Sequence, residues 1–294
     1  MAQAKEKRIS VDLTPHLDKY NAAQAPSDQS ANVHAAMPTV TVSIDAGVAH
    51  VTLARPEVRN AFNADVIREL REIFTILSRD DKVRAVVLSG EGKSFCGGAD
   101  INWMRGALDL GFAGNQADAE HMSDMFRAID RCSKPVIAKI HGAALGGGAG
   151  LAAVCDIVIA DDEAIFGFTE VKLGIIPAVI SPFVIAKIGV SNARALFLTG
   201  ERFDAERALA IGLVHEVVTL YELDAVVDRK IAEIRSAGPQ AVVAAKKLIP
   251  TVAATEYDDT RKLTTSAIAE RRVSSEGQEG LRAFIERRKA SFVE

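Results

Sequence analysis

The sequence predicts an α/β protein in which parallel strands are joined by crossover helices. Three observations lead to this prediction: short β-branched runs recur along the chain, a segment with helical spacing follows most of them, and two glycine-rich loops come directly after strand-like runs. Strands that alternate with helices in this order favour a parallel sheet with helices packed against it. With 294 residues, of which 48% are hydrophobic and 25% charged, the chain is long enough to bury a large core.

Regular structure is expected to begin near Thr39. Alternating apolar and polar residues over 40–44, an Asp-Ala-Gly turn and a second run over 48–53 predict a β-hairpin. Asn63 is the expected N-cap of a helix whose apolar positions recur three and four residues apart. These positions are Val66, Ile67, Leu70, Ile73, Phe74 and Leu77.

The rest of the chain continues this order. Strands are expected at 85–88, 136–140 and 157–160, a helix at 119–131, glycine loops at 95–101 and 142–150, and a further helix ending at 154. Later helices are expected at 181–188, 204–211, 220–236 and 240–249, and residues 256–292 are expected to be almost wholly helical. The chain therefore divides into a flexible N-terminal arm (1–37), an α/β core (38–220) and a C-terminal helical region (221–294).

Composition excludes several classes of function. The net charge is −4 and no Lys/Arg cluster is interleaved with aromatics, so neither nucleic acid nor an anionic membrane is expected as a partner. The three cysteines, Cys96, Cys132 and Cys155, lack CxxC spacing, and no His and carboxylate spacing suggests a bound metal. The uncharged stretches 142–155 and 174–186 are shorter than the roughly 18 to 20 residues that span a bilayer. Without a signal-peptide pattern, the cytoplasm is the expected compartment.

The two glycine loops are the strongest candidates for chemistry. They read FCGGAD at 95–100 and ALGGGAGL at 144–151, and the second opens a helix. Glycine lets the backbone approach a ligand closely, and a helix N-terminus presents unpaired N–H groups. Two facing loops could place one N–H each on a carbonyl oxygen, as an oxyanion hole does. The alternative is tight strand-to-helix packing without a ligand, whereas a P-loop or dinucleotide fingerprint fits neither loop.

A series of motifs resembles the crotonase, or enoyl-CoA hydratase/isomerase, superfamily, and the matching segments run in order from about 39 to 292. The segments are Arg55-Pro56 with Asn60-Ala61-Phe62, SFCGGADI (94–101), KPVIAKIHGAALGGG (134–148), CDIVIA (155–160), FGFTEVKLGIIPA (166–178), LTGERFDAERALAIGLVHEVV (198–218) and FIERRKASF (284–292). The resemblance implies a spiral of ββα units with a C-terminal helical trimerisation region, assembled as a homotrimer or homohexamer. It also implies an acyl-CoA substrate, with coenzyme A as part of that substrate and no separate cofactor.

The resemblance assigns roles to individual residues. The amides of Ala99 and Gly147 would hold the thioester oxygen, and Glu170 would move a proton at Cα. Substrate contacts are expected from Arg59, Asn60, Ala61, Asp100, Ile101, Gly146, Gly150 and Pro177, and from Arg288 and Lys289 as exposed helix charges beside the CoA phosphates.

Hydratases of this family typically use two glutamates, and this chain has one of them. Glu170 matches the second, while the first falls on Gly150. A glutamate introduced at position 150 would therefore be expected to supply the missing acid. A carboxylate in an apolar pocket has a raised pKa and is suited to proton transfer near neutral pH.

Three functions remain open with a single acid. Glu170 could orient water and relay its proton in a hydratase, shuttle a proton between Cγ and Cα in a Δ3-Δ2 enoyl-CoA isomerase, or remain in an acyl-CoA-binding protein without activity. The phrase EVKLGIIPAVISP at 170–182 resembles the bacterial methylglutaconyl-CoA hydratase-like branch. It favours the hydratase, with a branched or carboxylated substrate such as 3-methylglutaconyl-CoA of leucine breakdown.

Other polar residues near the loops are expected to be structural. Glu120 and His121 fit an exposed helix pair better than an acyl pocket, and His141 fits a hydrogen-bonded strand end better than a catalytic base. Cys96 is expected to be a small buried side chain without a nucleophilic role.

Overall fold

The computed structural model describes residues 39–293, so the arm predicted at 1–37 lies outside the described residues. Its main sheet has six strands in the order β1-β2-β3-β4-β6-β9. They are β1 (Val40–Asp45), β2 (Val48–Leu53), β3 (Ala85–Gly90), β4 (Val136–Ile140), β6 (Ile157–Asp161) and β9 (Glu216–Val218). β1 and β2 form the expected antiparallel hairpin, and every later pairing in this sheet is parallel. The predicted α/β class is confirmed.

A second, smaller sheet was not predicted. It contains β5 (Ala143–Leu145), β7 (Ile165–Gly167) and β8 (Arg202–Asp204), in that order. β5 lies inside the segment expected to be a glycine loop, and β8 ends at Asp204, so the helix expected at 204–211 begins one residue later, at Ala205. Each strand has three residues, which is too short for an alternating pattern to be read from the sequence.

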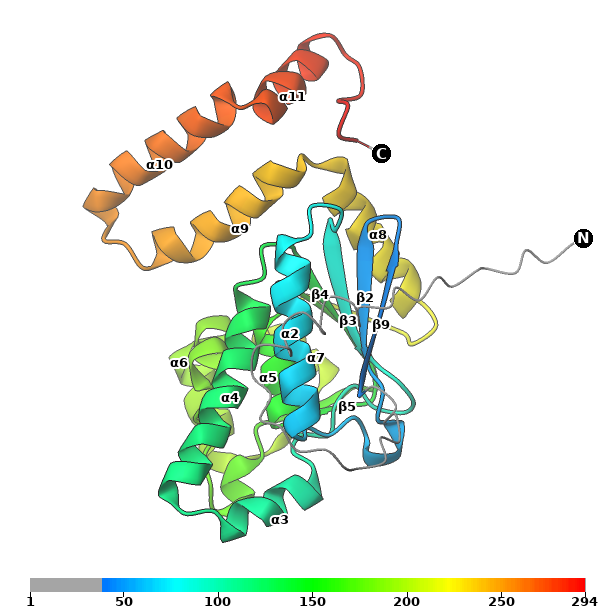
Figure 1. Cartoon of the computed structure of the whole chain (residues 1–294), viewed down its shortest axis with the longest axis vertical. Coiled ribbons are helices and arrows are strands. Elements are labelled where there is room, and N and C mark those ends of the chain that lie inside the picture. Colours follow the sequence, from blue (N-terminus) through cyan, green and yellow to red (C-terminus); the bar gives the residue numbers. More distant parts are fainter. Residues whose placement is uncertain (1–38, 294) are drawn as a thin grey trace, which may run out of the picture.

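The described part of the chain has ten α-helices besides the sheets (Figure 1). They are α2 (Ala64–Arg79), α3 (Ile101–Asp109), α4 (Phe112–Asp130), α5 (Gly147–Val154), α6 (Ser181–Thr199), α7 (Ala205–Ala210), α8 (Leu223–Ser236), α9 (Pro239–Ala253), α10 (Tyr257–Val273) and α11 (Ser275–Ile285). The 3-10 helices η1 (Pro56–Val58) and η2 (Glu170–Leu173) lie in loops. None of these helices is both long and apolar enough to cross a bilayer.

The helix predicted after Asn63 is confirmed. The Asn63 side chain accepts a hydrogen bond from the amide of Val66 and so caps α2, and all six predicted apolar positions are buried. α2 and α4 run side by side over one face of the main sheet (Figure 1). On β3, Val86 and Leu88 belong to the core on that side, whereas Val87 packs with α8 residues on the other side.

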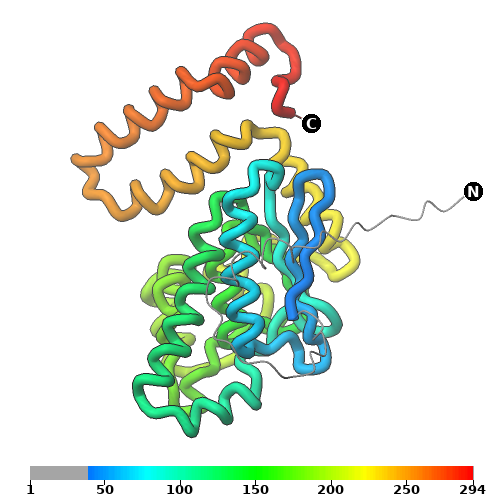
Figure 2. The backbone as a smooth tube through the Cα atoms, viewed as in Figure 1, coloured from blue at the N-terminus to red at the C-terminus, as the bar shows by residue number. Residues whose placement is uncertain are grey.

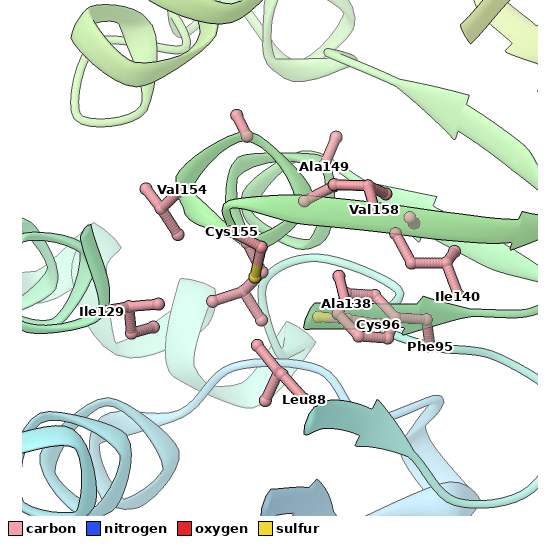
Figure 3. Close-up of a cluster of buried hydrophobic side chains, with 14 of the residues drawn as sticks. Leu88, Phe95, Cys96, Ile129, Ala138, Ile140, Ala149, Val154, Cys155 and Val158 are labelled. Atoms are coloured by element: carbon pink, nitrogen blue, oxygen red, sulfur yellow. The ribbon is translucent and has the colours of Figure 1, made fainter. Parts of the chain in front are cut away.

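The large core lies beneath the glycine loops. Figure 3 shows Leu88, Ala138, Ile140 and Val158 of the parallel strands gathered with Phe95 and Cys96 of the first loop and with α5. Because both loops are anchored on this close-packed cluster, the backbone at their tips is held in place by buried neighbours.

Several helix boundaries differ from the predictions. The helix expected at 119–131 begins at Phe112, and α3, none of whose residues is buried, precedes it unpredicted. The helix expected to end at 188 continues as α6 to Thr199, past a non-helical break at Gly189 (φ 75°).

The prediction of nearly continuous helix over 256–292 was wrong. Ser274 interrupts it, because its hydroxyl accepts from the amide of Gly277 and starts a new helix. The last helix ends at Ile285, and Arg287 takes a left-handed conformation with φ 55°. Figures 1 and 2 show α9, α10 and α11 extending away from the sheets.

Candidate active site

The two glycine loops lie side by side, as the oxyanion-hole hypothesis requires. The Cys96 amide donates to the carbonyl of Ala143 (2.9 Å), and the Leu145 amide donates to the carbonyl of Cys96 (3.0 Å). Gly98 has φ 101°, and a methyl group on it would lie 3.1 Å from the carbonyl oxygen of Leu145. Only glycine combines this backbone conformation with such a close approach of the second loop.

The amides of Ala99 and Gly147 are available for a ligand. On either side of Ala99, the Phe62 amide donates to the Gly98 carbonyl (2.7 Å) and the Asp100 amide donates to the Phe62 carbonyl (2.8 Å). Gly147 is the first residue of α5, where an N–H has no partner within the helix. Within residues 39–293 neither amide has a hydrogen-bond acceptor. The loops therefore present two free donors, one of them at the positive end of a helix dipole.

Glu170 brings a carboxylate to this turn. It opens η2, and a methyl group placed on Gly146 would lie 3.3 Å from Oε1 of Glu170. Oε2 is buried and has no hydrogen-bond partner in the described part of the chain. Burial raises the pKa of the Glu170 carboxyl, and a hydrogen bond from its own backbone only partly opposes this. A carboxyl group of raised pKa is suited to accepting and returning a proton.

Position 150 differs from the expectation. Gly150 is buried, and a methyl group there would overlap Cγ2 of Ile180 while lying 3.1 Å from Cζ of Phe126. The expectation that a glutamate at 150 would simply supply the missing acid is therefore wrong, because apolar side chains already fill the space.

Asn60 and Ala61 lie in the predicted loop but serve its structure. The Asn60 side chain accepts from the Arg55 amide (2.9 Å) and donates to the carbonyls of Glu91 (2.9 Å) and Ser94 (2.8 Å). The carbonyl of Ala61 accepts from the Arg55 guanidinium (2.6 Å). The buried Asn60 amide group is thus occupied within the protein, although its predicted contact with substrate stays a prediction.

Arg59 and Ile101 are the exposed members of the predicted set near the glycine loops. Arg59 has φ 56°, its carbonyl accepts from the amide of Gly97 (2.8 Å), and its side chain is exposed beside the first glycine loop. Ile101 begins α3 and is 66% exposed. Both side chains are free to meet a ligand at the edge of the loop.

Asp100 is a buried anchor. Its carboxylate pairs with Arg55 (2.8 Å) and accepts from the amides of Asn102 (2.8 Å) and Trp103 (3.3 Å), which caps α3. Burial alone would raise the pKa of Asp100, but the hydrogen bonds from Arg55 and the two amides lower it. Because Asp100 follows Ala99 directly, these contacts fix the Ala99 amide.

The C-terminal candidates are not brought to this site. Arg288 lies after the last helix, contrary to its predicted helical setting, and its guanidinium pairs with Glu279 (2.7 Å) and Glu286 (2.7 Å). The tail passes the opposite end of β3, where Arg84 donates to the carbonyl of Phe292 (3.5 Å). Lys289, the next residue after Arg288, also lies in the stretch that follows α11. Pro177, by contrast, is buried in the loop that follows η2.

The minor candidates behave as predicted. Nε2 of His141 is hydrogen-bonded to the Gly92 carbonyl (2.9 Å), and burial raises the pKa of Cys96 to about 12. Glu120 and His121 are exposed. His121 lines a pocket of about 250 Å³ with Trp103 and residues of α2, and no glycine-loop residue takes part in it.

Sequence reasoning missed three residues that shape the site. Arg55 anchors the loop, Phe62 holds the Ala99 turn, and Ile180 closes position 150. The first two were visible as part of a motif without an assigned role. Nothing in the local pattern around Ile180 indicates its contact with a helix that ends 26 residues earlier.

Comparison with known proteins identifies the family. The model of the family described as Enoyl-CoA hydratase/isomerase matches residues 43–294. A short-chain-enoyl-CoA hydratase of Clostridium acetobutylicum is 35% identical over 249 residues, which is 82% of this chain and 92% of that protein. A trans-2-decenoyl-[acyl-carrier-protein] isomerase of Streptococcus mutans is 30% identical over 259 residues, 86% of this chain and 97% of that protein. The crystal structure of an enoyl-CoA hydratase from Shewanella pealeana, 38% identical, superposes with a TM-score of 0.83 over 86% of this chain and 95% of that one.

Proposed function

The chain is an enzyme of the enoyl-CoA hydratase/isomerase family, and we propose that it hydrates the double bond of a 2-enoyl-CoA thioester. The observation that carries the proposal is the carboxylate of Glu170, whose Oε2 is buried with no partner among the described residues and which lies beside the glycine turn leading into α5. A carboxylate of raised pKa next to two free amides has what water addition to a conjugated thioester requires: a proton carrier and an oxyanion site.

In the proposed mechanism the amides of Ala99 and Gly147 bind the thioester oxygen. Glu170 takes a proton from water as the water oxygen bonds to Cβ, and the electrons of the double bond move through Cα to the thioester oxygen. The resulting enolate is stabilised by the two amides and by the dipole of α5. Glu170 then returns a proton to Cα, so one water is added and the carboxylate is restored.

We propose a branched or carboxylated substrate, such as 3-methylglutaconyl-CoA. Support comes from the sequence of 170–182, which resembles the branch of the family named for that substrate. Coenzyme A enters as part of the substrate, and the mechanism uses no other cofactor.

Isomerisation of a 3-enoyl-CoA is the second candidate. The observation that favours it is the apolar filling around Gly150, which leaves proton transfer to Glu170. A shuttle that removes a proton from Cγ and returns it to Cα needs only one carboxylate and no water. The similarity to the Streptococcus mutans isomerase is compatible with this reaction.

The test is a turnover screen with three substrates: crotonyl-CoA, 3-methylglutaconyl-CoA and a 3-enoyl-CoA. Loss of the conjugated-thioester absorbance with either 2-enoyl substrate is the expected result, with 3-methylglutaconyl-CoA preferred. Gain of conjugation from the 3-enoyl-CoA alone would replace hydration by isomerisation. Tight binding of all three without turnover would refute both reactions.

We also propose that the chain assembles as a homotrimer or homohexamer and works in the cytoplasm. Large apolar side chains on the projecting C-terminal helices are exposed, among them Tyr257, Val273, Phe284 and Ile285 at 78–87%. The three cysteines are free and buried, which suits a reducing compartment. In such an assembly Arg288 and Lys289 would meet CoA phosphates of a neighbouring copy. Light scattering gives the subunit number, and a monomer at micromolar concentration would contradict the assembly.

A further inference from the structure

The space beside Gly150 is closed by two buried side chains. Ile180 is 3% exposed and Phe126 is completely buried. A methyl group on Gly150 would overlap Cγ2 of Ile180, and it would lie 3.1 Å from Cβ of Ile180 and 3.1 Å from Cζ of Phe126. The Cγ2 atom is therefore the main obstacle, and the two contacts at 3.1 Å are tight but tolerable.

Position 150 faces the reacting end of the site. The Gly150 amide donates to the Gly146 carbonyl (3.0 Å), so Gly150 lies one helical turn beyond the glycine turn. Side chains on a helix lean towards its N-terminus, and a side chain at 150 would lean back over Gly146. The Glu170 carboxylate lies against Gly146 from its own loop. Position 150 is thus a second place from which an acid could reach the reacting atoms.

Ile180 cannot yield this space easily. Its carbonyl accepts from the amides of Phe183 (3.1 Å) and Val184 (3.0 Å), which fixes its backbone at the start of α6. Phe126 is held between two other rings, Phe62 at a centroid distance of 6.2 Å and Phe183 at 6.0 Å. Ile180 and Phe126 therefore form a rigid apolar surface against Gly150.

We infer that Ile180 is a positioning residue that excludes any side chain, and so any second acid, from position 150. It leaves proton transfer to Glu170, and a glutamate can act from position 150 only after Cγ2 of residue 180 has been removed. This inference rests on the proposed function for its catalytic meaning, whereas the packing it describes is independent of turnover.

The packing is tested by thermal unfolding of paired variants. Gly150→Ala alone is expected to lower Tm by roughly 5 °C because it overpacks this apolar surface. Ile180→Ala removes Cγ2. It should therefore lower Tm far less in the Gly150→Ala background than in the wild type. Ile180→Val is the matched control, since valine keeps Cγ2 and should give no such relief. The assignment to Ile180 would be overturned if valine and alanine at position 180 reduced the Tm loss of Gly150→Ala equally. It would also be overturned if neither reduced it.

The catalytic consequence is tested by the pH dependence of kcat/KM. Gly150→Glu in the Ile180→Ala background is expected to add a second carboxyl ionisation that Ile180→Ala alone does not show. Gly150→Glu with native Ile180 is expected to lose folding or activity. An unchanged pH profile in the double variant would overturn the inference. Absence of turnover by the wild type would instead refute the proposed function, while the unfolding series would still decide whether Ile180 closes position 150.

Discussion

Replacing Glu170 by glutamine is predicted to raise stability and abolish activity together. Among residues 39–293 Oε2 of Glu170 is buried without a partner, and burial raises the pKa of the carboxyl. Leaving a buried polar group unpaired costs about 1 to 3 kcal/mol, and more for a charged one. Glutamine keeps the shape and removes the charge, so we expect a gain of about 1 kcal/mol at pH 7.5, or roughly 3 °C in Tm.

The pH dependence of this gain has a definite sign. Because the folded-state pKa lies above the unfolded value of about 4.3, the folded protein binds more protons than the unfolded chain between the two values. The wild type therefore loses stability as pH rises through the folded pKa. The advantage of Glu170→Gln should be largest above that pKa and vanish below about pH 4.3.

Activity should change in the opposite direction. Without a carboxylate to carry the proton, kcat is expected to fall by roughly 10² to 10⁴-fold. KM should change little, because in the proposed mechanism the amides of Ala99 and Gly147 still bind the thioester oxygen.

The assay combines thermal unfolding between pH 4 and 8 with turnover of the best substrate from the screen. Glu163→Gln makes the same chemical change at an exposed carboxylate between β6 and β7, and it should alter neither Tm nor kcat. A Glu170→Gln protein that is less stable yet fully active would refute both the electrostatic reasoning and the catalytic role.

Three further predictions concern the loops that hold the oxyanion amides. Gly98→Ala strains a backbone with φ 101° and should displace the neighbouring Ala99 amide, which is expected to reduce kcat by roughly 10² to 10³-fold. The control is Gly106→Ala, in open space on α3, which should leave kcat unchanged and Tm equal or higher. Asp100→Asn weakens the pair with Arg55 and should cost about 1 to 3 kcal/mol at pH 7 by chemical unfolding; since the folded pKa of Asp100 is lowered, the difference from the wild type should shrink as pH falls below about 4. Asn60→Ala leaves three backbone groups without their partner and should lower the urea midpoint by an amount equivalent to about 1 to 3 kcal/mol, so an unchanged midpoint would contradict the anchoring role.

The elements that the sequence predicts well are those with a strong local pattern. The hairpin at 40–53 alternates cleanly, and α2 has six apolar positions at helical spacing behind a capping Asn63. α3 was missed. The Asp100 side chain caps its first turn, and none of its residues is buried. The three-residue strands of the small sheet depend on tertiary pairing, which a local pattern does not record.

The site was only partly predictable for the same reason. The glycine loops and Glu170 follow from motifs within short segments, and the structure brings Glu170 to the turn that precedes Gly147. Contacts between distant segments were not visible in the sequence. Ile180 meets Gly150 through the packing of α6 on α5, so side chains fill the space that the sequence suggested was free for a glutamate at position 150. A missing side chain in a motif therefore does not imply free space.

Residues predicted to touch substrate also hold the backbone next to Ala99, one of the two proposed oxyanion donors. Arg55 joins the carbonyl of Ala61 (2.6 Å) to the carboxylate of Asp100 (2.8 Å), and its own amide is bound by Asn60 (2.9 Å). Arg55 thus ties Asp100, which follows Ala99, to the Asn60-Ala61 loop, while Phe62 bonds the backbone of Gly98 and of Asp100 on either side of Ala99. An amide that is already oriented needs no rearrangement as charge develops on the thioester oxygen, which is the condition under which a hydrogen-bond donor lowers a barrier most. In the proposed mechanism the motif around Asn60 and Asp100 would thus act on the reaction through the backbone of Ala99, and a variant that loosens it should lower kcat even if every contact with coenzyme A is kept.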